Sequence, residues 1–157
     1  MPDLEDLTPA MKAAIGREGP PVIHEVTAPG IRTFARALGY TNPVYFDARA
    51  ARAKWHRDLL SPPGFFGMPV YAPDVRSDSD SLAFAPEFSR TLNGGNEVEP
   101  IAEICAGDIL EARTRVTDIS LRASKLGQMM IVLQETAFTR QGTDEVVARA
   151  RKTSLRY

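Results

Sequence analysis

The chain has 157 residues, of which 43% are apolar and 25% are charged, and these values are typical of a single globular domain. With 19 basic and 20 acidic residues its net charge is −1, which argues against a protein that binds nucleic acid through a basic excess. One cysteine and two histidines exclude a disulfide within the chain and make a zinc site of Cys and His unexpected. We therefore expect no metal.

We interpret residues 1–157 as one domain, with residues 1–15 as an N-terminal extension. That extension is acidic and lacks the apolar core of a signal peptide, and no stretch reaches the roughly 20 apolar residues of a membrane span. A cytoplasmic protein without a membrane segment is expected. Cys105 is interpreted as a packed residue rather than a nucleophile, and His24 and His56 as solvated or capping residues.

Helical patterns dominate the chain before about residue 90. A short β-rich segment, 21–26, precedes a helix that Thr27 can cap, along which apolar residues recur at i, i+3, i+4 and i+7. Gly39 is suited to end that helix. Asp47 predicts a second, short helix through Trp55, with Trp55 on its apolar stripe.

The segment SPPGFFGMPVY begins with a Pro-Pro-Gly entry and predicts a turn or two of helix starting near Gly64. Pro69 and Pro73 argue against a long continuation of that helix. Residues 71–90 combine a polar run with aromatic insertions, and we interpret them as a mobile loop. Such a loop can serve the function or be a disordered excursion, and the sequence leaves both readings open.

Four strands are predicted in the second half of the chain, at 95–104, 109–121, 127–139 and 145–155. Pro100 favours an edge position for the first of them. The apolar phase shifts between Val116 and Ile119, which indicates a bulge in the second. Four strands in meander order, preceded by helices, describe an α+β domain with one sheet packed on helix.

The segment FARALGYTNPVYFDARAA, residues 34–51, resembles the hydratase motif of MaoC-like (R)-specific enoyl-CoA hydratases and dehydratases. SPPGFFG and LNGGNEVEP, the latter followed by CAGD, come in matching order. The likeness therefore covers about residues 15–157, and it is nearest to the N-terminal MaoC-like dehydratase domain. It implies a hot-dog fold, an antiparallel sheet wrapped around a central helix that would begin at about Gly64.

The same resemblance implies the ligand and the assembly. Protomers of the family pair into a double hot dog, here as a homodimer or as a heterodimer or heterotetramer with a catalytic MaoC-like chain. An acyl-CoA or acyl-carrier thioester enters at the interface as substrate, and no cofactor is implied. The family's reaction adds water reversibly across the 2,3 double bond of the enoyl thioester.

An Asp and a His carry that reaction in the family pattern Gly-Asp-x-Asn-Pro-x-His. This chain keeps Gly39, Asn42 and Pro43, but Tyr40 stands at the Asp position and Tyr45 at the His position. A phenol with an ordinary pKa near 10 is a poor base for water at neutral pH. We therefore expect that the catalytic dyad is lost in this chain.

The acyl-binding half of the site is expected to persist at Pro63, Gly64 and Phe65. Gly64 matches the glycine at the start of the family's central helix, whose amide would contact the thioester oxygen. A plain helix entry at Pro63 and Gly64, a simple turn at Asn42, and packing roles for the two tyrosines remain open alternatives.

Three functional hypotheses follow. In the first, the chain is a non-catalytic subunit of an enoyl-CoA hydratase or dehydratase and completes the acyl-binding pocket of a catalytic partner. In the second, it is a homodimeric module that binds an acyl thioester without catalysis. In the third, it is an enzyme with a rewired site that uses Tyr45 as an acid or His56 brought in by the fold.

Overall fold

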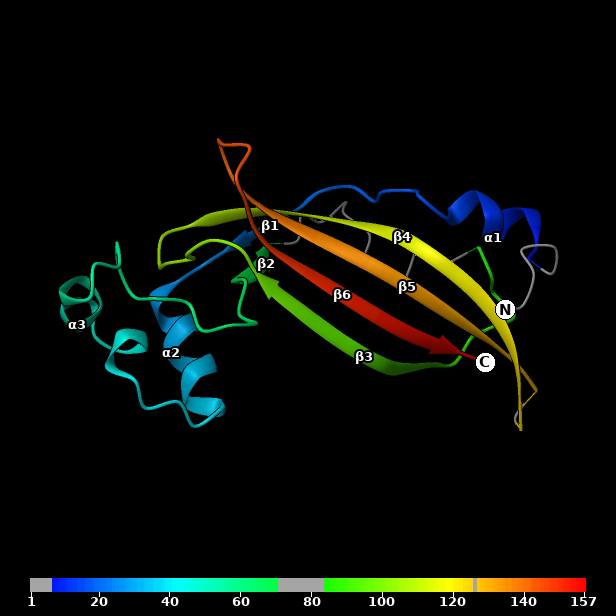
Figure 1. Cartoon of the computed structure of the whole chain (residues 1–157), viewed down its shortest axis with the longest axis horizontal. Helices are drawn as coiled ribbons and strands as arrows, with labels where there is room; N and C mark the ends of the chain where they lie inside the picture. Colours follow the sequence, from blue (N-terminus) through cyan, green and yellow to red (C-terminus); the bar gives the residue numbers. More distant parts are fainter. Residues whose placement is uncertain (1–6, 71–83, 126) are drawn as a thin grey trace.

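A curved six-stranded antiparallel sheet forms the body of the protein (Figure 1). The computed structural model describes residues 7–70, 84–125 and 127–157. The strands of the sheet lie in the order β2-β1-β4-β5-β6-β3. Their bounds are β1 (Val22–Glu25), β2 (Met68–Val70), β3 (Thr91–Pro100), β4 (Ile109–Ser124), β5 (Gly127–Arg140) and β6 (Val146–Arg156).

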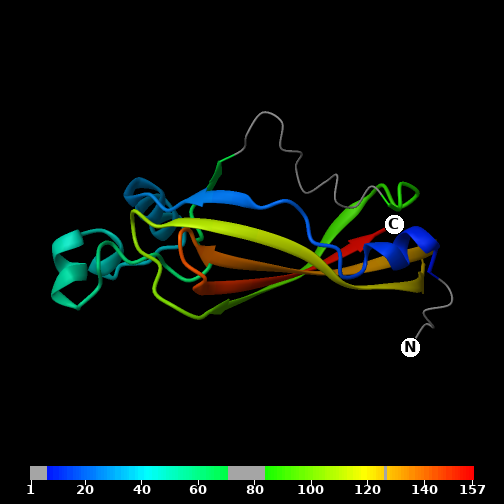
Figure 2. The same cartoon turned by 90° about the horizontal axis from the view of Figure 1, so that it is seen from above.

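Short helices lie at both ends of the long strands, as Figures 1 and 2 show from two directions. The α2 and α3 helices lie at one end, which we call the helical end, and α1 lies at the other. Across the described ranges, no helix is long and apolar enough to cross a membrane. The helical elements are α1 (Pro9–Ala14), α2 (Ala28–Ala37), the 3-10 helix η2 (Pro43–Tyr45) and α3 (Ala48–Ala53).

Several local predictions are confirmed. The Thr27 side chain accepts a hydrogen bond from the Gly30 amide at 3.2 Å and caps α2, and Gly39 follows the helix with a φ of +73°. The register of β4 against β5 shifts between Val116 and Asp118, where the phase change indicated a bulge. The expected edge strand is β3, which lies at one margin of the sheet.

The predicted meander order is wrong for β3. This strand pairs with β6, so the connection 101–108 crosses the ends of β6 and β5 before β4 begins. Amides of Ile101 and Ala102 donate to the Val147 carbonyl at 2.9 and 3.0 Å and hold the crossing in place. Alternation identifies strands but not their neighbours, because it records only which face of a strand is buried.

The expectation of a central helix that begins near Gly64 is also wrong. Pro63 and Gly64 form a turn, Gly64 has a φ of +88°, and the chain continues into β2. The φ of +82° at Gly67 interrupts any helix, and a side chain there would lie 2.5 Å from the Glu25 carbonyl oxygen. The described part of the sheet is instead covered by separate elements at its two ends.

Two hydrophobic clusters cover one face of the sheet at its two ends. At the helical end, Ile31 of α2 packs with Leu110 of β4 and Phe138 of β5. At the other end, Met11 of α1 packs with Met130 of β5. The strands therefore act as a platform on which each group of helices is fixed by its own apolar contacts.

The packing of the structure corrects three further predictions. Met11 and Ala14 of α1 are buried, so the supposed N-terminal extension is partly core. Ala85 and Phe88 are buried in the same cluster, so the supposed mobile loop is packed at these two positions, while residues 71–83 lie outside the described residues. The second helix ends at Ala53, and Trp55 is 94% exposed rather than packed on an apolar stripe.

A buried carboxylate ties the helical end to the sheet. Asp108, which immediately precedes β4, has a side chain only 6% exposed. It receives two hydrogen bonds from Arg57, at 3.1 and 2.9 Å, and an ion pair from Arg140, the last residue of β5. The Cys105 amide donates to the same carboxylate at 2.9 Å. We call Arg57, Asp108 and Arg140 the Asp108 cluster.

The charge of Asp108 is favoured by this environment. Burial alone would raise the pKa of its carboxyl group, but the hydrogen bonds from Arg57, the Cys105 amide and Arg140 outweigh burial and lower it. Arg140 also donates to the Glu103 carbonyl at 2.8 Å and so holds the crossing connection. One carboxylate thus joins the segment after α3, the crossing connection and the end of β5.

Removing this carboxylate should destabilise the fold strongly. We expect Asp108→Ala to lower the free energy of unfolding by about 3–5 kcal/mol, since two guanidinium groups lose a buried partner. The matched control is Asp118→Ala, which removes an exposed carboxylate of β4 and should change stability little. Urea unfolding followed by circular dichroism measures both, and equal effects would contradict the role given to Asp108.

The same carboxylate should make stability depend on acid. Because the pKa of Asp108 is lowered in the folded state, its contribution is complete above about pH 4 and is lost as the pH falls through the folded value. The stability gap between the wild type and Asp108→Asn should therefore narrow between pH 7 and pH 3. If urea titrations give a constant stability difference between the two proteins from pH 7 to pH 3, the stabilising role of the charged Asp108 carboxylate is refuted.

Candidate functional site

The motif segment 39–47 forms a compact loop between α2 and α3. Asn42 accepts a hydrogen bond from the Val44 amide at 3.2 Å through its side chain and so caps η2. Val44 is 2% exposed, and its carbonyl accepts a hydrogen bond from the Leu60 amide at 3.1 Å. The side chain of Asp47 accepts a hydrogen bond from the Arg49 amide at 2.8 Å and starts α3. Local hydrogen bonds therefore fix the backbone of the motif.

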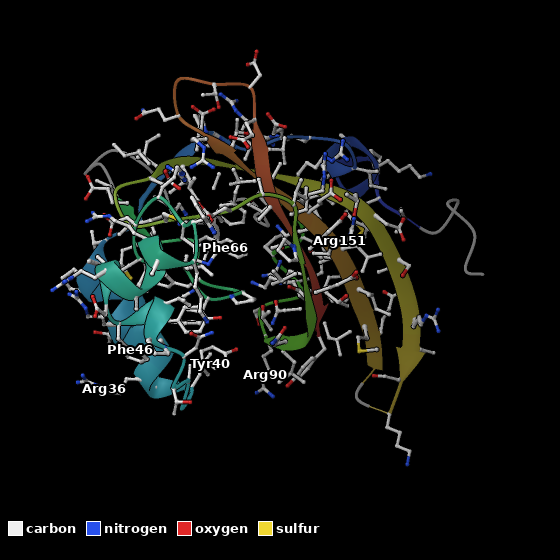
Figure 3. The ribbon with its side chains drawn as sticks, turned by 60° about the vertical axis from the view of Figure 1, so that its left-hand side comes forward. Arg36, Tyr40, Phe46, Phe66, Arg90 and Arg151 are labelled. Atoms are coloured by element: carbon white, nitrogen blue, oxygen red, sulfur yellow. The ribbon has the colours of Figure 1, made fainter. Side chains whose placement is uncertain are left out.

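The two tyrosines of the motif lie against each other. The ring centroids of Tyr40 and Tyr45 are 5.5 Å apart, with the ring planes inclined at 41°. Tyr40 is 39% exposed, whereas Tyr45 packs against the cluster at the helical end. Figure 3 shows Tyr40 at this end of the molecule, with Phe46 nearby. The structure thus brings together the two positions that the sequence comparison singled out.

The predicted acyl-binding residues occupy a turn beside this loop. The Phe65 amide donates to the Pro62 carbonyl at 3.1 Å across Pro63 and Gly64, and the Ser61 hydroxyl donates to the Phe65 carbonyl at 2.7 Å. A side chain at Gly64 would meet no atom within 4 Å, so its backbone faces open space.

Phe65 is part of the core rather than of an open wall. It is 7% exposed, and its ring centroid lies 5.1 Å from that of Phe34 on α2. Its ring also covers Gly30, where an added Cβ would lie 2.9 Å away. The substrate-binding roles of Pro63, Gly64 and Phe65 stay predictions.

A histidine and a carboxylate that the sequence did not connect meet at the same end of the sheet. His56 Nδ1 lies 2.6 Å from Glu103 Oε2, and the two side chains are 25% and 32% exposed. Burial would raise the pKa of Glu103, but hydrogen bonds from His56, Cys105 and the Arg57 amide lower it. The expectation of a solvated or capping His56 is therefore wrong, because a carboxylate orients its imidazole.

The other histidine and the cysteine are packed residues. His24 lies partly buried in β1, with its ring edge-on to Phe138 at 5.5 Å, so it is not a solvated or capping residue. Cys105 is fully buried, and burial raises the pKa of its thiol to about 11, which confirms a packed residue rather than a nucleophile. Its Sγ donates to Glu103 at 3.2 Å.

Sequence reasoning missed Glu103, Asp108 and Arg140. Asp108 stands in the CAGD segment that carried part of the resemblance, and a carboxylate directly before a strand was the only available signal. The partners come from positions 32 to 51 residues away, so spacing could not reveal them. Among the described residues, no group of three or more His, Cys, Asp and Glu side chains could hold a metal ion.

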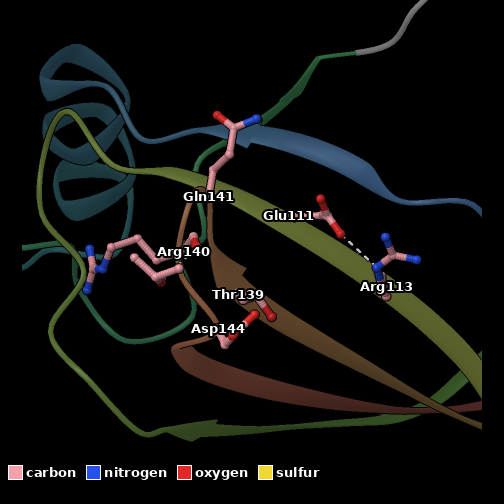
Figure 4. A pocket seen from close by; sticks show the side chains of 8 residues that line it. Glu111, Arg113, Thr139, Arg140, Gln141 and Asp144 are labelled. Atoms are coloured by element: carbon pink, nitrogen blue, oxygen red, sulfur yellow. Dashed lines mark hydrogen bonds and ion pairs between the residues drawn. The ribbon is translucent and has the colours of Figure 1, made fainter.

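An open polar cavity of about 420 Å³ lies at the turn between β5 and β6 (Figure 4). It contains none of the predicted site residues, and charged and amide side chains dominate its lining, so it does not suit an acyl chain. Glu111 and Arg113 pair across its wall at 2.7 Å. The lining residues are Glu111, Arg113, Thr139, Arg140, Gln141, Gly142, Thr143 and Asp144.

Comparison with known proteins identifies relatives over most of the chain. The family described as FAS1-like, dehydratase domain region, matches residues 13–149. The UPF0336 protein Lxx02810 of Leifsonia xyli is 34% identical over 146 residues, which are 90% of this chain and 92% of that protein. The family match includes the motif segment and strands β3 to β5, and it ends within β6.

Solved structures share the fold at lower identity. The ChsH1-ChsH2 complex from Mycobacterium tuberculosis contains a chain that superposes with a TM-score of 0.80 at 21% identity, covering 98% of this chain and 97% of that one. A chain of the HadBC (3R-hydroxyacyl-ACP dehydratase) complex from the same organism gives a TM-score of 0.68 at 21% identity, covering 90% and 96%. The MaoC-like dehydratase from Rhodospirillum rubrum gives 0.60 at 22% identity, covering 98% and 95%.

These likenesses agree with the curled antiparallel sheet and with the order of the motif segments along the chain. The chain therefore belongs to the family of FAS1-like dehydratase domain regions and has the hot-dog fold of MaoC-like dehydratases.

Proposed function

We propose that this chain is a subunit of a heteromeric hydratase or dehydratase that acts on enoyl thioesters. In this proposal a partner with the MaoC-like fold supplies the Asp and His, and this chain completes the acyl-binding pocket. The observation that carries the proposal is the pair of phenols, Tyr40 and Tyr45, at the two positions where the family pattern has its Asp and His. The backbone frame of the motif is kept while its proton-transferring groups are replaced.

The surroundings of the two phenols support the loss of catalysis. A base for water needs a group that can be ionised and held beside the attacking molecule. In the part of the chain that the structure describes, neither tyrosine hydroxyl forms a hydrogen bond or an ion pair with another side chain. The rings contact each other instead, which is the behaviour of packing residues.

The free margin of the sheet supports an assembly. All ten residues of β3 are exposed, and Leu92 and Val98 on it are 51% and 37% exposed. Charged side chains usually protect an exposed edge strand from pairing with another chain. On β3 both carboxylates are instead paired with Arg151 of the neighbouring β6, Glu97 at 3.2 Å and Glu99 at 2.9 Å. Figure 3 shows Arg151 on the sheet. Such an edge suits pairing with a strand of another protomer.

Relatives of similar architecture support a partner that is a different chain. The ChsH1-ChsH2 and HadBC structures are complexes of two named subunits. By analogy, the missing Asp and His would be supplied across an interface between unlike protomers. A bulky acyl group could then extend into the half of the assembly in which the dyad is lost.

Co-expression tests this proposal directly. We expect that this chain and a MaoC-like chain with an intact Asp and His purify as a stable heteromer, and that the complex hydrates crotonyl-CoA faster than the partner alone. Native mass spectrometry measures the composition, and the loss of enoyl absorbance measures turnover. A chain that stays homodimeric beside the partner and adds nothing to its turnover would contradict the proposal.

The exposed edge generates a more local prediction. Val98→Lys adds a charge to β3 and should weaken the heteromer by about tenfold or more, because the new ammonium group must be desolvated at the interface. Met68→Lys is the matched control, since it places the same charge on the opposite margin, where Met68 is 59% exposed. Equal dissociation constants for the two variants would exclude β3 as the interface.

The contact between His56 and Glu103 favours one second candidate, an enzyme with a rewired site. A carboxylate that orients an imidazole is an arrangement used for proton transfer. Under the main proposal, Tyr45→Phe and His56→Gln in the complex change kcat by less than about twofold. Under the rewired reading, one of them lowers kcat by about 100-fold or more. Urea unfolding of each variant separates loss of chemistry from loss of fold.

A further inference from the structure

Exposed apolar side chains line the margin of the sheet that lies opposite to β3. Met68 and Val70 of β2 are 59% and 48% exposed, and Ile109 at the start of β4 is 39% exposed. The register pairs Glu25 of β1 with both Met68 and Ile109. It also pairs Ile23 with Val70. Side chains that are opposite each other, or two apart on one strand, share a face of the sheet. We call Met68, Val70, Ile109 and the half-buried Ile23 the β2 strip.

The β2 strip faces away from the core. Leu110, which follows Ile109 along β4, is fully buried on the opposite face. His24, which follows Ile23 along β1, lies edge-on to Phe138 of the hydrophobic cluster at the helical end. Because successive residues of a strand point to opposite faces, the strip itself lies on the outer surface. Exposed apolar patches with a polar rim are typical of protein interfaces.

Carboxylates without a cation of their own border the strip. Glu25 lies within it, Asp144 lines the cavity at the turn between β5 and β6, and among the described residues neither forms an ion pair. Glu111, two residues after Ile109 on the same face of β4, lines the same cavity (Figure 4). The Gln141 amide donates to the Ile109 carbonyl at 2.8 Å and joins this turn to the strip. The polar cavity therefore continues the apolar strip and adds negative charge beside it.

The same chain carries the complement of this surface at the C-terminal end of α3. Trp55, the only tryptophan of the sequence, is 94% exposed and has a φ of +69°, a conformation that is strained for a bulky side chain. Its neighbour Lys54 is exposed and, within the described ranges, forms no ion pair. Tryptophan is among the residues most enriched at the energetically dominant contacts of protein interfaces. An uncovered aromatic ring beside an unpaired ammonium group complements an apolar strip bordered by unpaired carboxylates.

We propose that Trp55 and Lys54 of one copy dock on the β2 strip of a second copy of this chain. The ring would cover the apolar side chains of the strip, and the ammonium group would pair with Glu25. Both halves are exposed in the single chain, so they do not satisfy each other within one molecule. Because α3, β1 and β2 all lie toward the helical end (Figure 1), a two-fold axis beside that end would form the contact twice.

Charge favours a copy of this chain as the occupant. Residues 48–57 hold four Lys and Arg and no Asp or Glu, so the rest of the chain carries a net charge of −5. The basic segment of one copy is therefore attracted to the acidic margin of another. The same carboxylates would repel nucleic acid and an anionic lipid surface.

This contact is separate from the sheet edge at β3. The strand order places β2 and β3 at opposite margins, so a second copy on the β2 strip leaves β3 free for the proposed partner. Pro69, in the middle of β2, has no amide hydrogen to offer to a further strand. A second copy would therefore bind the outer face of this margin through side chains rather than extend the sheet.

Self-association of the purified full chain tests the proposal. Sedimentation velocity at increasing concentration should show a dimer that weakens as the salt concentration rises, because part of the contact is ionic. As the dimer forms, the emission of Trp55 should shift to shorter wavelengths and acrylamide should quench it less. Because Trp55 is the only tryptophan, its emission reports this contact alone.

Two variants and a control locate the contact. Trp55→Ala removes the docked ring and Val70→Lys places a charge that must be desolvated, so each should weaken the dimer by about tenfold or more. Trp55 is almost fully exposed in the single chain, so Trp55→Ala preserves the fold even if Val70→Lys does not. The matched control is Val98→Lys, which makes the same substitution on β3 and should change self-association by less than about twofold.

Three results would overturn the contact between copies. The first is a chain that stays monomeric up to about 1 mM. The second is a folded Trp55→Ala or Val70→Lys variant that associates as tightly as the wild type. The third is an equal loss of association in Val98→Lys, which would place the contact at β3 or show that it is unspecific. The proposed function is decided separately, because assembly and turnover with the MaoC-like partner measure it.

Discussion

The fold depends most on the buried charge of Asp108. Its carboxylate joins Arg57, which follows α3, to Arg140 at the end of β5, and Arg140 in turn holds the connection that leads from β3 to β4. That connection crosses two strand ends and places β3 at the margin beside β6. The crossing thus links the edge strand β3 to β4 beside the segment that follows α3. A buried carboxylate with two guanidinium partners supplies this fixing.

Under the proposed function, this chain keeps the backbone support of the motif but not its chemistry. Gly39 still ends α2 and Asn42 still caps η2, so the loop that would hold an Asp and a His in the family pattern is built by ordinary local hydrogen bonds. The side chains at the decisive positions, Tyr40 and Tyr45, contact each other instead. A protomer of this kind can keep the shape of half a site and an open edge while the reaction itself depends on another chain.

Local features of the fold were predictable from the sequence, and long-range ones were not. The cap at Thr27 and the bulge after Val116 follow from residue type and periodicity, which act over a few positions. The place of β3 and the absence of a helix at Gly64 depend on contacts between distant segments. The same holds for the pairing of His56 with Glu103, 47 residues apart. The motif itself was located by resemblance, because spacing alone does not distinguish it from a turn.

We propose that proton transfer belongs to a partner and not to this chain. The most direct test is single-turnover hydration of crotonyl-CoA by the intact heteromer in which only the partner's motif histidine is replaced by alanine. We expect an assembled complex, with unchanged composition by native mass spectrometry, that has no measurable hydration. Hydration at more than a few per cent of the wild-type rate in that complex would show that this chain carries catalytic groups of its own and would contradict the account.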